Sequence, residues 1–118
     1  MPSQRFEQVE VWQKAHQWVL GIYRLTEVFP KHEMFGLTNQ LRRAAVSVPA
    51  NFAEGFKRSS LTEKLRFYNI AQGSLEECKY FLILAQDLNY GDTKNLRSEA
   101  ETVSRMLDAY MQAVRNAR

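Results

Sequence analysis

The sequence is poor in the residues that most often form catalytic or metal-binding sites. Its 118 residues include one cysteine, Cys78, so no internal disulfide can form, and this favours a reducing compartment. The two histidines, His16 and His32, occur in no His-x-x-x-His, Glu-x-x-His or Cys-x-x-Cys spacing. Cys78 falls among apolar residues, where a thiol behaves as a small hydrophobe. We therefore expect no metal, no cofactor and no enzymatic activity.

Long apolar runs and targeting segments are also missing. The longest apolar stretch, residues 80–85, is far shorter than the ~18 residues of a membrane span. Residues 1–10 have neither the basic start nor the apolar core of a signal peptide. No glycine-rich phosphate loop is present. We expect a cytoplasmic protein with a single domain over residues 1–118, and neither a membrane nor a small-molecule substrate as its partner.

Positive charge is concentrated in the middle third of the chain. The formal net charge is +3, but residues 37–68 hold six basic and two acidic residues and so carry +4 by themselves. The remainder therefore carries −1. A local excess of this kind is the electrostatic requirement for binding a polyanion such as nucleic acid, although a mildly basic total alone is common in other proteins.

Apolar residues recur at three- and four-residue steps through most of the chain, which predicts helices and no strands. The predicted helices cover about 9–29, 36–53, 61–88 and 93–116. Pro30 ends the first, Gly55 caps the second and Ser60 caps the third. Because the connections are short, we predict an antiparallel up-down-up-down four-helix bundle. The predicted core residues are Trp12, Val19, Leu41, Val48, Leu75, Leu82, Val103 and Leu107.

Two residues inside the predicted helices are unusual there. Pro49 removes a backbone donor from the second helix. The apolar pattern nevertheless keeps its phase across Pro49, so we predict a continuous helix with a kink there. The rival interpretation is a break at 47–48. Gly73 weakens the third helix by about 1 kcal/mol relative to alanine. Close approach of another helix is the usual compensation, and we expect it here.

The first helix carries a second apolar stripe, formed by Val11, Trp18 and Leu25 at seven-residue steps. The third helix is apolar over a similarly broad surface. If one apolar face suffices for an isolated bundle, the extra faces need another partner. These three residues are therefore the predicted interface of a homo-oligomer.

A polar stripe on the second helix is the strongest candidate for a binding surface. Arg43, Ser47, Asn51, Glu54 and Arg58 follow one another at steps of three and four residues, which places them along one side of the helix. One interpretation is a solvated helix face with weak Arg–Glu pairs. The other is a recognition surface whose arginines and asparagine donate to phosphates and base edges, with Glu54 either orienting Arg58 or accepting from a base amine.

Three segments resemble a known family: residues 41–55 (LRRAAVSVPANFAEG), 11–15 (VWQKA) and 71–77 (AQGSLEE). They are similar to segments of the 23S rRNA intervening-sequence proteins, small bacterial proteins often described as four-helix-bundle proteins. The resemblance implies a four-helix bundle and a ring of five copies, a homopentamer. The accessory variability determinant of diversity-generating retroelements is similar in fold and binds nucleic acid, which is only an analogy for function.

Two functions therefore remain open. The first is a non-catalytic, oligomeric module that binds RNA or another nucleic acid. In this case Arg42, Arg43, Lys57 and Arg58 make the phosphate contacts, while Asn51 and Glu54 shape the site. The alternative is a structural or protein-interaction scaffold that self-assembles without nucleic acid. The salt dependence of binding distinguishes these two functions, because phosphate contacts release counterions and apolar contacts do not.

Overall fold

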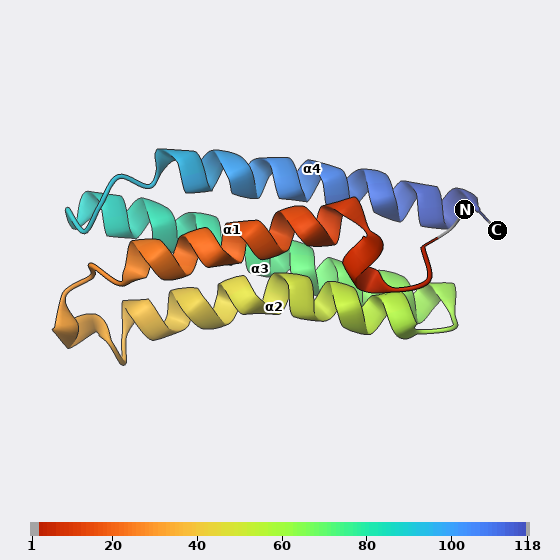
Figure 1. Ribbon diagram of the computed structural model, residues 1–118, viewed down its shortest axis with the longest axis horizontal. Helices are drawn as coiled ribbons and strands as arrows, with labels where there is room; N and C mark the ends of the chain where they lie inside the picture. The colour runs from red at the N-terminus through yellow and green to blue at the C-terminus, as the bar shows by residue number, and fades with distance from the viewer. Residues whose placement is uncertain (1–2, 118) are drawn as a thin grey trace.

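The computed structural model describes residues 3–117, which form four long antiparallel helices (Figure 1). The helices are α1 (Glu10–Thr26), α2 (Leu37–Lys57), α3 (Leu61–Asp87) and α4 (Lys94–Asn116), with short 3-10 helices η1 (Phe6–Gln8) and η2 (Lys31–Glu33). Each helix packs on the next and α4 packs on α1, so α1 lies diagonally across the bundle from α3. The predicted all-α four-helix bundle is confirmed, and residues 3–117 contain no strand.

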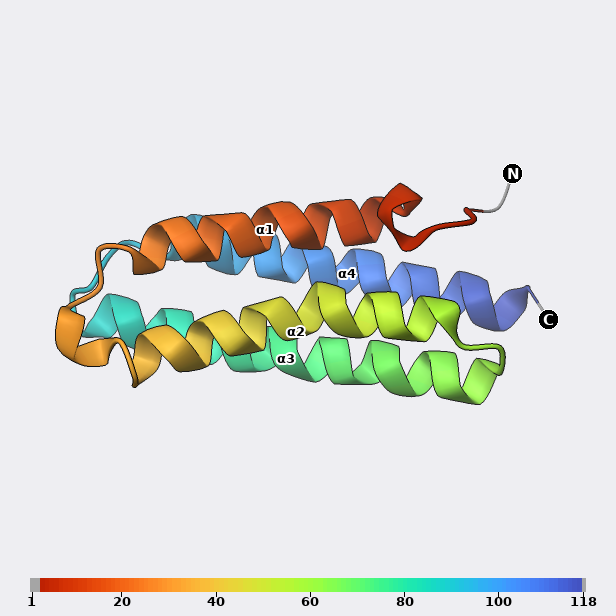
Figure 2. The same ribbon diagram turned by 60° about the horizontal axis from the view of Figure 1, so that its bottom comes forward.

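The two ends of the elongated bundle differ in what they hold (Figures 1 and 2). We call the end with the chain termini and the α2–α3 turn the terminal end. The loop end holds the α1–α2 and α3–α4 connections. Since the helices alternate in direction, α1 and α3 both run from the terminal end to the loop end. None of the helices in residues 3–117 combines the length and apolarity needed to cross a bilayer.

The core is a continuous column of side chains from all four helices, as the periodicity predicted. Its largest fully buried members are Trp18, Tyr68, Ile22, Leu41, Leu75, Leu82, Leu107, Val48 and Val103. Of the eight predicted core residues, all but Trp12 are buried. Trp12 is half-buried on the surface of α1, where its ring stacks on His16 and meets Phe6 edge-on, each at 5.1 Å between centroids.

The ends of the helices follow from local hydrogen bonds. α1 ends at Thr26, three residues earlier than predicted, because the amides of Val28 and Phe29 turn back to bond the carbonyls of Leu25 and Thr26. That tight turn directs Phe29 into the core. The predicted cap of α3 is confirmed, since the Ser60 hydroxyl accepts a hydrogen bond from the amide of Glu63 at 3.1 Å.

The second helix continues without a break through Pro49 to Lys57. This excludes the predicted alternative of a break at 47–48, while the kink remains a prediction. The predicted cap at Gly55 is wrong, because Gly55 is buried inside the helix. A Cβ atom there would lie 2.7 Å from a ring carbon of Tyr68. Gly55 is therefore required for close packing of α2 on α3, and the extended residue Arg58 ends the helix.

The expectation for Gly73 is also wrong. It is exposed, and no heavy atom lies within 4 Å of the position of a Cβ atom. No other helix of this chain approaches it. The helix cost of this glycine therefore has no packing compensation within one copy of the protein.

The second apolar stripe of α1 belongs to the core of the chain. Val11 and Trp18 are buried, and the Trp18 indole donates to the carbonyl of Leu96 on α4 at 3.0 Å. Leu25 is half-buried against Gly91. A helix in a four-helix bundle contacts two neighbours, here α2 and α4, so it needs both stripes without any second copy. The reason for placing an oligomer interface at these three residues is therefore wrong.

Candidate nucleic-acid interface

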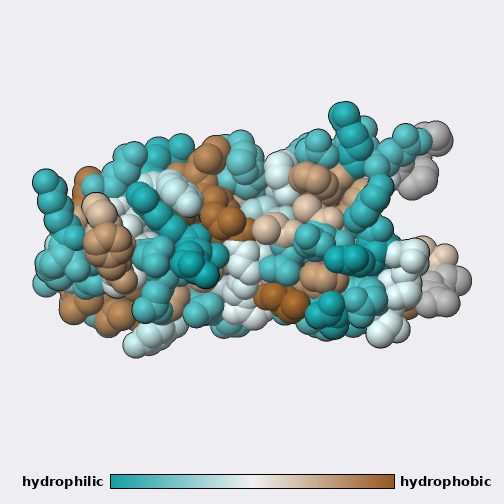
Figure 3. Space-filling view, turned by 90° about the horizontal axis from the view of Figure 1, so that it is seen from below, coloured by the Kyte–Doolittle hydropathy of each residue, from teal (hydrophilic) through white to brown (hydrophobic). Residues whose placement is uncertain are grey.

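The polar stripe of α2 lies along the seam between α2 and α3. Ser47 is bonded to both helices: the hydroxyl of Ser74 donates to its hydroxyl at 2.9 Å, and the Asn51 amide donates to its hydroxyl and its carbonyl at 2.8 Å. Arg43 and Glu77 flank this point in a depression of about 280 Å³. Figure 3 views the molecule from this side, where hydrophilic residues separate small apolar patches. The stripe is thus partly a helix–helix contact and partly a surface.

Arg42 is directed towards α1. Its Nε atom donates to the Thr26 hydroxyl at 2.7 Å, a second nitrogen lies 3.4 Å from the Tyr23 carbonyl, and its guanidinium lies 4.5 Å from the centre of the Tyr23 ring. These contacts bind the last turn of α1 to α2. Arg42 therefore has a structural role in this chain, and the neighbouring Arg43 is the exposed member of the pair.

Arg58 is held in place at the terminal end by two contacts. It forms an ion pair with Glu54 at 2.8 Å, a contact that both interpretations of the stripe predicted. Its guanidinium also lies over the ring of Phe67, 4.8 Å from the ring centre. Both contacts leave part of the guanidinium exposed. Arg58 is therefore pre-organised at the surface, with donors that still face solvent.

A second arginine shares the same aromatic ring and was not among the predicted site residues. Arg66 lies over Phe67 at 4.5 Å from the ring centre and pairs with Glu63 at 3.1 Å. The Arg66 hydrogen bonds and the nearby charge of Arg58 together lower the pKa of Glu63. The three-residue spacing of Glu63 and Arg66 was visible in the sequence. The approach of Arg58 to the same ring depends on how the α2–α3 turn folds back.

Two lysines complete this region with different roles. The Lys64 amine donates to the Phe56 carbonyl at 2.7 Å, so it satisfies the end of α2, and partial burial lowers its pKa. Lys57 is exposed. Together with Arg5 it flanks an apolar-floored groove of about 470 Å³ that includes Phe6. The sequence-based prediction missed Arg5, because it lies 52 positions before Lys57 in the chain.

The terminal basic cluster consists of Arg5, Lys57, Arg58, Lys64 and Arg66. Three acidic residues accompany it, Glu7, Glu54 and Glu63, so these eight residues together carry a net charge of +2. The loop end, taken as the two connections and the six helix residues on each side of them, holds five basic and five acidic residues and carries no net charge: Arg24, Lys31, Arg42, Lys94, Arg97, Glu27, Glu33, Asp87, Asp92 and Glu99. The charge excess in the middle of the sequence thus becomes a difference between the ends of the bundle.

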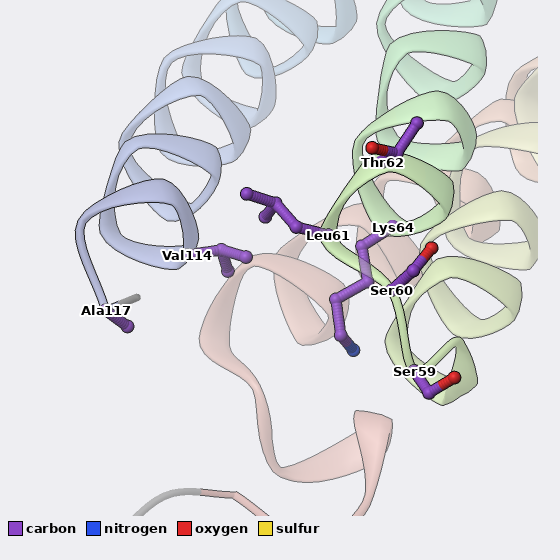
Figure 4. Close-up of a pocket in the computed structure, with 7 residues that line it drawn as sticks. All are labelled: Ser59, Ser60, Leu61, Thr62, Lys64, Val114 and Ala117. Carbon is purple, nitrogen blue, oxygen red and sulfur yellow. The ribbon is translucent and has the colours of Figure 1, made fainter.

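A shallow pocket of about 460 Å³ lies beside this cluster, between the start of α3 and the end of α4. Figure 4 shows Ser59, Ser60, Thr62 and Lys64 on one side of it, and Val114 with Ala117 on the other. Its hydroxyl-rich wall is polar and uncharged apart from Lys64. It widens the solvent-facing surface on which the arginines lie.

Cys78 and the two histidines are the residues that the sequence analysis considered for catalysis and metal binding. Cys78 is fully buried, and burial raises the pKa of its thiol to about 12, so thiolate chemistry is disfavoured. His16 stacks on Trp12, and His32 is exposed on η2. In the described residues, no three His, Cys, Asp or Glu side chains gather as a metal site does.

The structure therefore defines a small four-helix-bundle protein with an unequal distribution of charge between its ends. The family model of the 23S rRNA-intervening sequence protein matches residues 7–109, and the chain belongs to this family. This confirms the resemblance read from the three sequence segments. No curated protein is similar enough to the chain to count as a match.

Proposed function

We propose that the protein is a non-catalytic, oligomeric module that binds RNA through its terminal basic cluster. The observation that supports this most is the pair Arg58 and Arg66, held at one half-buried aromatic ring. Guanidinium groups fixed in this way lose little conformational freedom on contact with a phosphate. Lys57 and Arg5 add charge, and neither is in an ion pair within residues 3–117.

The proposed contact residues differ from the sequence-based set. Lys57, Arg58 and Arg43 remain in it as phosphate contacts, and Arg66 and Arg5 join it. Arg42 leaves it because its donors bind α1. Asn51 and Glu54 keep their proposed role of shaping the site, through bonds to Ser47 and Arg58 respectively.

Oligomerisation belongs to the same proposal. A ring of five copies is what the family resemblance implies, and it brings five weak charged surfaces to one nucleic acid. Effective concentration then multiplies a modest single-site affinity, so a net charge of +3 per chain is sufficient. A cytoplasmic location is part of the proposal, because RNA is the partner and Cys78 is a free thiol.

The test is a titration of fluorescent structured and single-stranded RNA at several salt concentrations. We expect the logarithm of the affinity to fall linearly with the logarithm of the salt concentration. The variant Arg58→Ala/Arg66→Ala should fold, because both side chains are exposed, and should reduce the slope by about 1.4 to 1.8, since each phosphate contact contributes ~0.7 to 0.9.

The scaffold alternative has an observation in its favour, since Glu54 and Glu63 already neutralise Arg58 and Arg66. If the parent protein binds no RNA or DNA at low salt, the binding proposal fails and the scaffold replaces it. If the folded double variant binds with an unchanged slope, the protein binds nucleic acid through another surface.

A further inference from the structure

Two exposed apolar pairs lie on the outside of the bundle. Leu20 and Tyr23 on α1 are 37% and 39% exposed, and we call them the α1 patch. Tyr80 and Ile83 on α3 are 59% and 43% exposed, and we call them the α3 patch. The α3 patch borders a groove of about 470 Å³ between α3 and α4. Neither patch is part of the core. The α1 patch pairs a leucine with a tyrosine, and the α3 patch pairs a tyrosine with an isoleucine.

The two patches lie on opposite sides of the bundle at the same level. They are opposite because α1 and α3 are the diagonal pair. Helix α4 shows that they are level. Its residue Leu96 lies beside Gly21 of the α1 patch region, since a Cβ atom built on Gly21 would be 2.9 Å from the Leu96 side chain. The next residue, Arg97, lines the groove that the α3 patch borders. A line through both patches therefore crosses the bundle at right angles to its long axis.

A charged residue follows each patch along its helix, and the two charges have opposite signs. Arg24 lies four residues after Leu20, and Asp87 lies four residues after Ile83, so each charge is one helical turn closer to the loop end on its own helix. Both residues are exposed. Neither takes part in an ion pair within residues 3–117.

We infer that the α3 patch of one copy docks on the α1 patch of the next copy, with Asp87 pairing with Arg24 across the contact. The inference rests on the self-association in the proposed function and not on nucleic-acid binding. Such a contact joins two different surfaces, so each copy can use its α3 patch to bind one neighbour and its α1 patch to bind another. Because the patches are level, successive copies stand side by side without a step along the bundle axis, and the row closes into a ring only where each contact also rotates the next copy about that axis.

The first test uses multi-angle light scattering to measure the molar mass of two variants, each with one isoleucine of α3 replaced by glutamate. We expect Ile83→Glu to reduce the parent oligomer to monomers, because a charge is placed in the apolar contact. Ile70→Glu is the matched control. Ile70 is 41% exposed on α3 but lies outside the patch, so this variant should keep the parent mass. Thermal unfolding by circular dichroism should show both variants folded.

The second test distinguishes the proposed contact from a two-fold one. Ile83→Glu retains an intact α1 patch, and Leu20→Glu retains an intact α3 patch. Each variant alone should be monomeric. In an equal mixture, the intact α3 patch of Leu20→Glu can dock on the intact α1 patch of Ile83→Glu. Assembly should stop at this dimer, because the patches left free both carry the new charge. In a two-fold contact between α3 patches, Leu20→Glu would keep the parent mass, and that result overturns the inference.

The charge pair is tested by reversal. Arg24→Asp and Asp87→Arg should each weaken the oligomer, shifting its midpoint to higher protein concentration, and the double variant should restore it. A parent protein of monomer mass at micromolar concentration would reject self-association itself. A parent oligomer unchanged by Ile83→Glu would overturn only the assignment of the contact, and the RNA titration would be unaffected by that outcome.

Discussion

The two ends of the bundle use charged residues in different ways. At the loop end, Glu33 serves the fold: one of its oxygens accepts the Tyr90 hydroxyl at 2.7 Å and the other the Leu37 amide at 3.1 Å, joining the two connections. At the terminal end, Arg58 and Arg66 rest on an aromatic ring with part of each guanidinium exposed. A charged residue in the sequence can therefore mean either a structural bond or a surface for a ligand.

The terminal end depends on the close packing of α2 on α3 at Gly55, and Gly55→Ala should have the largest effect. Its Cβ atom would lie 2.7 Å from Tyr68 and 3.0 Å from the Cβ atom of Phe67, so α2 and α3 must separate. We expect a loss of about 1 to 3 kcal/mol of unfolding free energy, as for other overpacked sites. Urea denaturation measures it. Unchanged stability would show that the turn holding Arg58 is looser than described.

Near the loop end, Arg42→Ala tests whether this arginine is structural. We expect the protein to lose about 1 kcal/mol of stability, because the bond to Thr26 and the contact with Tyr23 disappear. The salt slope of RNA binding should stay at the parent value. A variant with parent stability and a smaller slope would return Arg42 to the binding surface and extend that surface beyond the terminal end.

Between the two ends, Gly73→Ala should stabilise the chain. The position is open, so the helix propensity of alanine is gained without a clash, worth about 0.5 to 1 kcal/mol. Its urea midpoint should therefore rise while that of Gly55→Ala falls. A loss of stability at Gly73 would indicate that something outside this chain, such as a second copy, approaches the glycine.

The smallest effect is expected at the loop end, from Tyr90→Phe. The Tyr90 hydroxyl is the main cause that lowers the pKa of Glu33, followed by the Leu37 amide. A lowered pKa in the folded state stabilises the fold above the pKa of the unfolded state, and this stabilisation is lost as the pH falls through the folded value.

In Tyr90→Phe the pKa of Glu33 should rise towards its ordinary value in an NMR titration. Its thermal midpoint should lie slightly below that of the parent near neutral pH, and the difference should diminish in acid as Glu33 becomes protonated. A parent-like pKa for Glu33 would contradict the described connection between the two loops.

Much of the fold could be predicted from the sequence because helix periodicity is local. The four helices, the Ser60 cap and the path through Pro49 all followed from spacing within one helix. The close helix packing expected at Gly73 occurs at Gly55 instead, because the role of a glycine depends on what faces it in the folded chain. The two stripes of α1 were misassigned because periodicity counts apolar faces without showing how many neighbours a helix has.

The candidate site could be predicted only in part for the same reason. Glu54 and Arg58 lie one helical turn apart, so their ion pair was predictable. The contact of Arg58 with Phe67 crosses the α2–α3 turn, and the contacts of Arg42 cross to α1. Such contacts decide which arginines remain available to a ligand, and they exist only in the folded chain.

The central claim is that nucleic acid binds at the terminal end. Its most direct test compares Lys57→Ala/Arg58→Ala at that end with Lys31→Ala/Lys94→Ala at the loop end, in RNA titrations over a range of salt. Each variant removes two positive charges from exposed positions, so the change in net charge is the same. We predict that the terminal variant lowers the salt slope by about 1.4 to 1.8 while the loop variant keeps the parent slope. Equal slopes for the two variants would contradict the claim, because binding would then follow total charge and not the terminal basic cluster.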